Sequence, residues 1–234
     1  MKKVIFFTGL MFFLSAGIFS QALNTLTPTE KKDGWVLLFD GKSLNGWTTS
    51  NDQPIPEGGW EIKDGILSTV VGPKGVDIIT ANEYSNFELV LDYNVTPACN
   101  SGVKYFFTTY NPGGKLGCEY QILDDVLGED AKQANHRLGS LYDLFPPDES
   151  KKKVNAPGEW NSIKIVSKGK KIEHWLNGIK ILEVTRGDEA YLAAVAKSKF
   201  NNAVPTFGMV EKGHILLQYH QGLVYYRNIK IRVL

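Results

Sequence analysis

From Gly34 onward the chain consists of short apolar or alternating runs separated by Gly, Pro, Asn and Asp. Successive side chains of a β-strand point to opposite faces, so this pattern is typical of strands joined by tight turns. Asn177-Gly178 in particular predicts a two-residue hairpin turn. The expected strands are Trp35–Phe39, Trp60–Lys63, Ile66–Val71, Val76–Thr80, Asn86–Val95, Gly102–Tyr110, Gly117–Leu123, Trp160–Lys168, Lys171–Leu176, Ile179–Thr185, His214–His220 and Val224–Val233.

One segment, near residues 188–200, has a helical pattern instead. Asp188 can cap a helix, and it is followed by Glu-Ala-Tyr-Leu-Ala-Ala-Val-Ala-Lys. Many evenly spaced strands with one late helix predict an all-β fold, a two-sheet antiparallel sandwich of jelly-roll type. About 200 residues follow residue 33, which suits a single domain over residues 34–234.

The first twenty residues differ from the rest of the chain. Two lysines precede an apolar stretch from Val4 to Phe19, and small residues follow it. This order predicts a secretory signal peptide over residues 1–20, followed by a polar linker over 21–33. The stretch is short and interrupted, and no Cys stands nearby to accept a lipid. We therefore expect a periplasmic or secreted protein without stable membrane insertion.

The charged residues nearly balance. There are 26 Lys and Arg against 25 Asp and Glu, a formal net charge of +1. Such a chain has no general electrostatic attraction to nucleic acid or to an anionic membrane, so a neutral small-molecule partner such as a carbohydrate fits better. Cys99 and Cys118 are expected to be free, buried thiols, because the hairpin described below keeps them apart.

The segment from Glu119 to Asp124 places polar residues inside an expected buried strand. A buried carboxylate has to be paired, hydrated in a cleft or raised in pKa, so Glu119 needs a purpose. A regular strand would point Glu119 and Asp124 to opposite faces, whereas one β-bulge near Ile122-Leu123 would bring both to the same face. Sugar-cleaving β-sandwich enzymes use acids at the two ends of a bulged strand, so the segment indicates a carbohydrate site.

A hairpin centred on Pro112-Gly113 connects this strand to the one before it. Strand geometry then sets Lys104 opposite Gln121 and Phe106 opposite Glu119. Lys104, Glu119 and Gln121 are therefore expected on one face. Lys104 is the obvious structural partner of the carboxylate.

The segment His214–His220 carries a second group of polar side chains. Alternation places His214, Gln218 and His220 on one face. If Gln221-Gly222 is a two-residue turn, the returning strand adds Arg227 to that face. Taken singly, each of these side chains can equally be a solvent-facing or backbone-bonded residue.

Three more polar residues stand near these hairpins. Asn100 begins the triplet Asn100-Ser101-Gly102, where glycine permits close backbone approach and the polar side chains can cap or bind. His174 lies just before the Asn177-Gly178 turn, and His136 sits in a long loop. These two histidines and His220, with Glu119 or Asp124, could bind a divalent metal ion, but no short His-to-His spacing supports this.

Several of these motifs together resemble the 3-keto-disaccharide hydrolase family, over nearly the whole chain after the leader. The motifs, in order, are Gly34–Trp47, Asn100–Gly102, Glu119–Asp124, Gly158–Asn161, His174–Gly178 and Arg227–Ile231. The resemblance implies a concanavalin A-like jelly roll. It also implies hydrolase or lyase activity on glycosides whose sugar carries a ketone at carbon 3.

The chemistry of such a sugar suggests roles for the candidate residues. The ketone acidifies the hydrogen on C2, so a base can remove it and the glycosidic oxygen can leave by elimination. This needs a base, an acid for the leaving oxygen and a cation or donor for the enolate. The hypothesis gives proton transfer to Glu119 or His220, and the enolate to Arg227, Lys104 or a divalent metal. Substrate binding is expected from Asn100, Lys104, Gln121, Asp124, His174 and Gln218.

One departure from the family keeps a second interpretation open. The family's last motif usually has an acid where this chain has Tyr219, and a glycine where it has Gln221. If that acid were catalytic, the protein would be a non-catalytic, lectin-like carbohydrate-binding module. Alternation points Tyr219 away from the face of His220, which favours a supporting role for the position. An ordinary retaining glucanase is a third alternative, with Asp124 as its second carboxylate.

Overall fold

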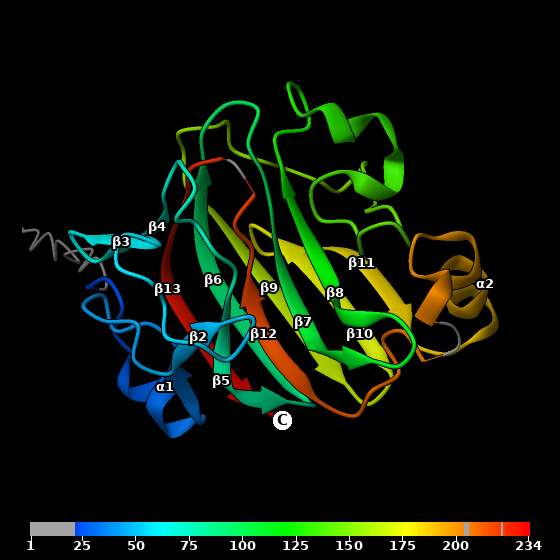
Figure 1. Cartoon of the computed structure of the whole chain (residues 1–234), viewed down its shortest axis with the longest axis horizontal. Helices are drawn as coiled ribbons and strands as arrows, with labels where there is room; N and C mark the ends of the chain where they lie inside the picture. Colours follow the sequence, from blue (N-terminus) through cyan, green and yellow to red (C-terminus); the bar gives the residue numbers. More distant parts are fainter. Residues whose placement is uncertain (1–21, 204–205, 221) are drawn as a thin grey trace, which may run out of the picture.

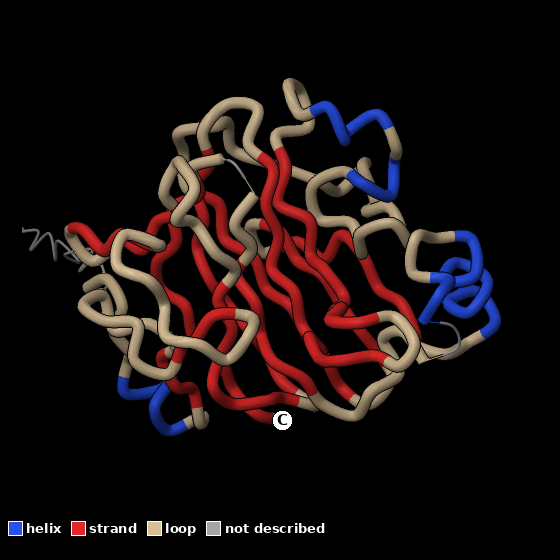
Figure 2. The backbone as a smooth tube through the Cα atoms, in the orientation of Figure 1, coloured by secondary structure: helices blue, strands red, loops and turns tan. Residues whose placement is uncertain are grey.

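The computed structural model describes residues 22–203, 206–220 and 222–234. They form two antiparallel β-sheets packed face to face, with loops and short helices at the periphery (Figures 1 and 2). The expected two-sheet jelly-roll sandwich is confirmed. The signal peptide expected over residues 1–20 lies outside the described residues. Within the described ranges, no helix is long and apolar enough to cross a membrane.

Over the described residues, the larger sheet has eight strands. Their order is β11 (Ile179–Thr185), β10 (Lys171–Leu176), β9 (Asn161–Lys168), β6 (Phe87–Val95), β13 (Val224–Val233), β4 (Ile66–Thr69) and β3 (Trp60–Lys63), and β1 (Trp35–Leu37) also pairs with β13. The smaller sheet, counted over the same ranges, has five strands. Their order is β2 (Trp47–Thr49), β5 (Ile78–Tyr84), β12 (Gly213–Leu217), β7 (Asn100–Tyr110) and β8 (Gly114–Leu123).

The core lies between the sheets and follows from strict alternation. In β6 every second residue from Phe87 to Val95 is buried. In the smaller sheet Val103 and Tyr105 of β7 and Tyr120 and Ile122 of β8 face the same core. Fully burying one large apolar side chain stabilises a fold by about 1.5–3 kcal/mol. The alternate residues of β7 and β8 are left on the outer face of the smaller sheet.

Two α-helices lie at the edges of the described structure. The expected late helix is confirmed as α2 (Glu189–Lys197), and its N-cap Asp188 accepts a hydrogen bond from Tyr191 N. The other, α1 (Pro28–Lys32), begins at a capping box made by Thr27 and Glu30. Short 3-10 helices cover η1 (Glu129–Lys132), η2 (Ala134–His136) and η3 (Asn201–Ala203).

The segment over 21–33, expected as a linker, is tied to the domain. The Asn24 N–H donates to Asn228 Oδ1 and the Asn228 N–H donates to Asn24 Oδ1, each at 2.8 Å. Asn24 Nδ2 also donates to Gly65 O at 2.7 Å. Asn228 has a φ of 54° and lies where the pairing of β13 with β6 shifts register. The paired asparagines therefore fasten the start of the described chain to an irregularity of its last strand.

The register of the β7–β8 hairpin differs from the prediction. Lys104 lies opposite Glu119, and Gly102 lies opposite Gln121. The expected shared face of Lys104, Glu119 and Gln121 is nevertheless present, because the register differs by two residues and a two-residue shift keeps each side chain on its face.

The β-bulge expected near Ile122-Leu123 is also wrong. The β8 pairing is regular up to Leu123, and the register shift lies in β7 between Tyr105 and Thr108. Phe106, inside that shift, has a φ of 53°. Since β8 has no bulge at its end, Glu119 and Asp124 are not brought to one face.

The last two strands do not form the expected hairpin. β12 pairs with β5 and β7 in the smaller sheet, whereas β13 pairs with β6, β4 and β1 in the larger one. The chain therefore crosses from one sheet to the other between Leu217 and Val224. Arg227 is carried away from the face of Gln218 and His220 by this crossing.

Both cysteines are free and buried, as expected. Cys118 lies opposite Tyr105 in the hairpin. Burial raises the pKa of Cys99 to about 12 and of Cys118 to about 11. Neither thiol is therefore poised as a nucleophile.

Candidate functional site

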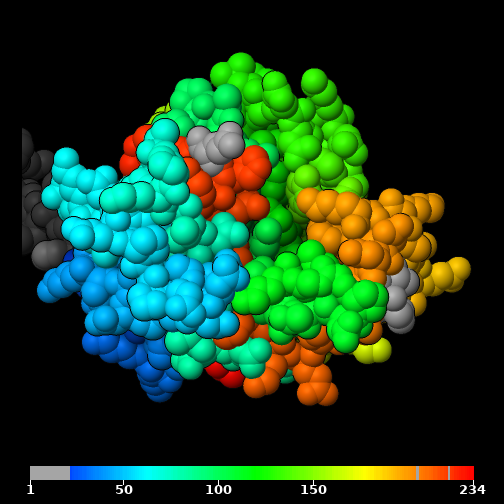
Figure 3. Space-filling view, in the orientation of Figure 1, coloured from blue at the N-terminus to red at the C-terminus, as the bar shows by residue number. Residues whose placement is uncertain are grey.

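A cleft of about 1030 Å³ opens on the outer face of the smaller sheet, over β7 and β8. Figure 3 shows the hollow between the green segments of these strands with their following loop and the orange segment around residue 199. Six of the nine residues singled out from the sequence line it. They are Asn100, Lys104, Glu119, Gln121, Gln218 and His220.

Glu119 is the central carboxylate of the cleft. Glu119 is only 6% exposed, and Lys104 Nζ lies 3.7 Å from Glu119 Oε2. Burial raises the pKa of Glu119, and the charge of Asp77 adds to this, while the charges of Lys104 and Lys199 partly offset it. A buried carboxyl group with a raised pKa next to a cation is suited to proton transfer.

Gly102 makes room for this carboxyl group. A Cβ at residue 102 would lie 2.1 Å from Glu119 Oε1 and 2.8 Å from the Glu119 carboxyl carbon. Because β7 and β8 pair at this point, any other residue would push Glu119 out of its position. The glycine of the Asn100-Ser101-Gly102 triplet therefore serves the site through its missing side chain.

The Gln121 amide lies between two polar neighbours. Its Nε2 donates to Asn100 Oδ1 at 3.2 Å. With the amide turned over, its nitrogen donates instead to Glu119 Oε1 and to Ser101 O, each at 3.2 Å. The floor of the cleft is thus a row of adaptable donors and acceptors beside the carboxylate, which suits recognition of sugar hydroxyls.

Gln218 and His220 enter the cleft from the segment that follows β12. The Gln218 N–H donates to Gly102 O at 3.0 Å, and Ser101 Oγ donates to Gln218 O at 2.8 Å. His220 is exposed at the rim. His214, expected in line with them, lies at the other end of β12, with its Nδ1 2.7 Å from Thr80 O.

Asp77 is a further carboxyl group near the site. Burial raises its pKa, against a hydrogen bond from Tyr219 N and the charges of Lys104 and His220. Tyr219 itself points away from the cleft. Its hydroxyl donates to Gly72 O at 2.5 Å, and its ring fills the space beside Gly75. The residue that departs from the family pattern therefore packs behind the site.

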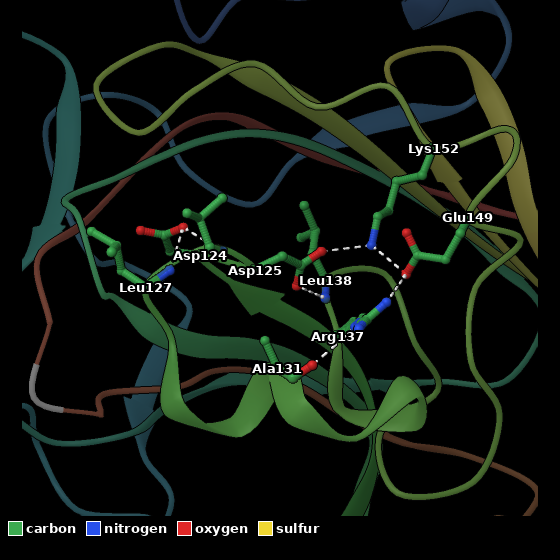
Figure 4. A network of polar contacts seen from close by, with 9 residues as sticks. Asp124, Asp125, Leu127, Ala131, Arg137, Leu138, Glu149 and Lys152 are labelled. Carbon is green, nitrogen blue, oxygen red and sulfur yellow. Dashed lines mark hydrogen bonds and ion pairs between the residues drawn. The ribbon is translucent and has the colours of Figure 1, made fainter.

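Asp124 does not lie in the cleft. Its carboxylate accepts hydrogen bonds from the N–H groups of Ala98, Val126 and Leu127 at 2.9, 3.0 and 3.3 Å. Burial acts to raise its pKa, but these three bonds outweigh it and lower the pKa. Asp124 ends β8 and caps the following turn (Figure 4).

The loop that begins at Asp124 is held by a second set of polar contacts (Figure 4). Asp125 Oδ1 accepts from Leu138 N at 2.8 Å, and Asp125 Oδ2 pairs with Lys152 Nζ at 2.6 Å. Lys152 also reaches Glu149 Oε1 at 2.7 Å. Since this loop supplies the upper wall of the cleft, its anchors help to fix the shape of the site.

His174 is a core residue that joins the two sheets. It is fully buried on β10, with Nδ1 3.0 Å from Gly139 O and Nε2 2.9 Å from the Tyr105 hydroxyl. The carbonyl requires a proton on Nδ1, so Nε2 accepts from Tyr105 and the ring is neutral. Burial lowers its pKa to about 4, and the backbone contacts only partly oppose this.

Arg227 lies on the outer face of the larger sheet. Its Nε donates to Asp92 Oδ2 at 3.2 Å, and its guanidinium carbon lies 3.9 Å from the ring centre of Trp160. These contacts explain why β13 carries a polar motif without any role in the cleft.

The sequence analysis missed several residues of the cleft. Among them, Asp130 and Tyr142 come from the loop after β8, and Lys199 comes from the segment after α2. The density of Asp, His and Tyr in that loop was a usable signal, but nothing in the chain order showed that Lys199 approaches it.

The donor set considered for a divalent metal ion is not assembled. His174 is buried between the sheets, and both ring nitrogens of His136 already contact carboxylates. Among the described residues, no group of three or more His, Cys, Asp and Glu side chains is placed to hold a metal ion.

A comparison with known families decides where this chain belongs. The model of the 3-keto-alpha-glucoside-1,2-lyase-like domain matches residues 34–232. The chain belongs to this family. The resemblance seen in the sequence motifs is thereby confirmed, and the matched range contains every residue of the cleft described above.

The chain is similar to a named relative and to a solved structure. A 3-keto-disaccharide hydrolase of Bacteroides thetaiotaomicron is 30% identical over 253 residues, covering 94% of this chain and 85% of that protein. A crystal structure from Parabacteroides distasonis, described as a candidate glycosyl hydrolase, is 31% identical with a TM-score of 0.80, covering 91% of this chain and 100% of that chain. Together they support an enzymatic role for this chain.

A more distant structure supports the fold alone. The catalytic domain of an endo-1,3-beta-glucanase (laminarinase) from Thermotoga petrophila has a TM-score of 0.50 at 10% identity, covering 86% of this chain and 98% of that chain. The 3-keto-alpha-glucoside-1,2-lyase-like chain thus shares the sandwich of such glucanases. In this chain Asp124, the candidate second carboxylate of a glucanase site, accepts hydrogen bonds from backbone N–H groups. This argues against a catalytic pair of Glu119 and Asp124 as in a retaining glucanase.

Proposed function

We propose that this protein cleaves the glycosidic bond of 3-keto-glycosides, as a hydrolase or a lyase. The observation that carries the proposal is Glu119, a buried carboxyl of raised pKa beside Lys104 in the main cleft of a chain from this family. The name of the Bacteroides relative points to 3-keto-disaccharides as the substrate class.

The proposed reaction begins with removal of the C2 proton by Glu119. The electron pair moves onto the C3 ketone as an enolate, and the Lys104 ammonium stabilises this charge. The enolate then expels the glycosidic oxygen from C1, and His220 at the rim supplies its proton. The product is an enone. Adding water across its C1–C2 double bond, with hydroxide to C1 and the proton returned to C2, completes hydrolysis.

Substrate binding falls to the polar floor of the cleft. Asn100, Gln121 and Gln218 are placed to bind sugar hydroxyl groups, because their amides can donate and accept. Arg227 has no place in this mechanism, since it lies on the other sheet, and neither His174 nor Asp124 faces the cleft. The proposed mechanism thus uses fewer residues than the hypothesis drawn from the sequence.

The decisive assay compares oxidised and ordinary disaccharides. Purified protein should release free sugar from 3-keto-trehalose or 3-keto-lactose and none from trehalose or lactose, measured by product chromatography. Binding of the keto-sugars without any turnover would favour the lectin-like module. Equal rates on the ordinary disaccharides would favour a glucanase-type mechanism.

We also propose that the protein is exported, to the periplasm or the outside of the cell. The support is the leader pattern of residues 1–20. N-terminal sequencing of the protein from its native host should give a chain that starts shortly after residue 20. A chain that retains the leader would contradict export by cleavage.

A further inference from the structure

One wall of the cleft is organised around His136, a residue with no place in the reaction proposed above. Its Nδ1 lies 2.7 Å from Asp130 Oδ1, and its Nε2 lies 2.9 Å from Asp143 Oδ1. His136 is 7% exposed and lines no part of the cleft itself, whereas Asp130 does. The imidazole therefore acts behind the wall.

Each of the two carboxylates has a second partner that faces the site. Asp130 Oδ2 accepts from the Tyr142 hydroxyl at 2.9 Å. Asp143 Oδ2 accepts from the backbone N–H of Lys199 at 2.7 Å. The Lys199 ammonium lies 4.2 Å from the centre of the Tyr142 ring. These contacts close a ring, from His136 through Asp130 and Tyr142 to Lys199 and back through Asp143.

This ring is joined to the strand that carries the central carboxylate. The Tyr142 N–H donates to the backbone carbonyl oxygen of Glu119 at 3.0 Å, which connects the loop to β8. Burial raises the pKa of Glu119, and the charge of Lys199 acts against that shift. A shift of Tyr142 and Lys199 would thus change both the width of the cleft and the electrostatic potential at the Glu119 carboxyl group.

The geometry determines the protonation of His136. An ionised carboxylate only accepts hydrogen bonds, so two carboxylate contacts require a proton on both ring nitrogens. Burial acts to lower the pKa of His136, but the hydrogen bonds to Asp143 and Asp130 outweigh it and raise the pKa. Asp130, Asp143 and Tyr142 from its own loop contact it. Beyond them, Lys199 from the segment after α2 acts on Asp130, and Glu119 from β8 acts on Tyr142.

We propose that His136 is a positioning residue whose imidazolium holds Asp130 and Asp143 together and so fixes Tyr142 and Lys199 as the wall of the cleft that faces Glu119. Its effect on catalysis rests on the proposed function, but the ring of contacts does not. The charged form is present below the raised pKa and is lost as the pH rises through it. Above that pH one hydrogen bond of the ring is lost and the wall loosens.

The test combines NMR titration with steady-state kinetics. In the full-length mature protein, the His136 imidazole signals, assigned by their loss in His136→Gln, should titrate above 6.5, the ordinary value for histidine. For a 3-keto-disaccharide, His136→Gln should raise KM about ten-fold while kcat changes less than about three-fold, as expected for loss of one charge-assisted hydrogen bond. The alkaline rise in KM of the wild type should be absent in the variant.

A second variant covers the case in which His136→Gln does not fold. Asp143→Asn keeps a residue that tolerates the φ of 62° at this position. It removes one of the two negative charges that contact the imidazolium. It should shift the His136 titration towards 6.5 and move the alkaline limb of KM with it. His214→Gln is the matched control. It removes a half-buried histidine whose contacts are Thr80 and Glu83 rather than any residue that surrounds His136, and it should leave KM unchanged.

Two results would overturn the proposal. A His136 titration at or below 6.5 in the wild type would show that the ring is not held by an imidazolium. An unchanged KM and pH profile in a folded His136→Gln protein would show that the wall does not depend on it. If no keto-glycoside is turned over, the titrations of the wild type and of Asp143→Asn still decide the protonation of the ring, and only the proposed function fails.

Discussion

Glu119→Gln should reduce kcat on 3-keto-disaccharides by about 10² to 10⁴-fold, the range expected for loss of a general base. Glutamine keeps the size of the side chain and its contact with Gln121, so the change removes the proton-accepting group alone. Rates are measured by product release at saturating substrate. Glu61→Gln, an exposed position of β3, is the matched control and should keep the wild-type rate.

The same residue sets the acid limb of the pH profile. Because burial raises the pKa of Glu119 above its ordinary value of 4.5, kcat/KM should begin to fall at a higher pH than a free glutamate would give. Burying an ionised carboxylate also opposes folding, so the melting temperature of Glu119→Gln at pH 7 should not decrease. A variant with normal melting but no activity would separate chemistry from folding.

His220→Ala is the partner experiment. It should slow release of the leaving group most for aglycones that are poor leaving groups, since His220 is assigned to protonate that oxygen. Full activity in both Glu119→Gln and His220→Ala would falsify the placement of the site in this cleft. Full activity in His220→Ala alone would leave Glu119 as base and remove the histidine from the mechanism.

The second large effect is expected on stability, from His174. Its pKa in the fold is about 4, below the value of 6.5 of an unperturbed histidine. The unfolded chain therefore binds a proton that the folded chain refuses, and stability is full above pH 6.5 and falls as the pH decreases towards 4. The expected loss is about 1.4 kcal/mol per pH unit, or about 3 kcal/mol over the interval.

His174→Gln isolates this contribution. The glutamine side chain can still accept a hydrogen bond from the Tyr105 hydroxyl, but it does not titrate. The variant should therefore lack the pH-dependent loss of unfolding free energy that is expected for the wild type. The measurement is urea unfolding at several pH values between 4 and 7, read as the difference between variant and wild type. Because other titrating groups cancel in that difference, a flat difference curve would contradict a neutral, buried His174. His214→Gln should keep the wild-type slope.

The strands were predictable because each is specified by its own residues. All twelve expected segments overlap a strand, several with the same bounds, as in Trp60–Lys63 and Lys171–Leu176. Among the strands of the described residues, only the three-residue β2 was missed, since three residues hold too little alternation to be seen. The shared face of Lys104, Glu119 and Gln121 was correct for the same reason.

The errors that displaced candidate site residues concern contacts between segments distant in the sequence. Alternation says that His174 faces one side of β10 but not that this side is the core, where Tyr105 and Gly139 satisfy its ring. It places Arg227 on a face of β13 but does not show that the chain changes sheets after β12. Lys199 reaches the cleft through Asp143, a contact between residues 56 positions apart. Which of these residues come into contact depends on how the two sheets pack, and the local pattern of apolar and polar residues does not show it.

The paired asparagines at the start of the described chain limit where the proposed leader can be cleaved. Asn24 supplies three of the hydrogen bonds that join this segment to Asn228 and Gly65. A cut after Asn24 would leave these groups without those partners, and each buried group left unsatisfied costs about 1–3 kcal/mol. Cleavage of the proposed leader that preserves full stability is therefore expected before residue 24. The last strand of the sandwich thus depends for its hydrogen bonds on a residue only a few positions after the expected cleavage point.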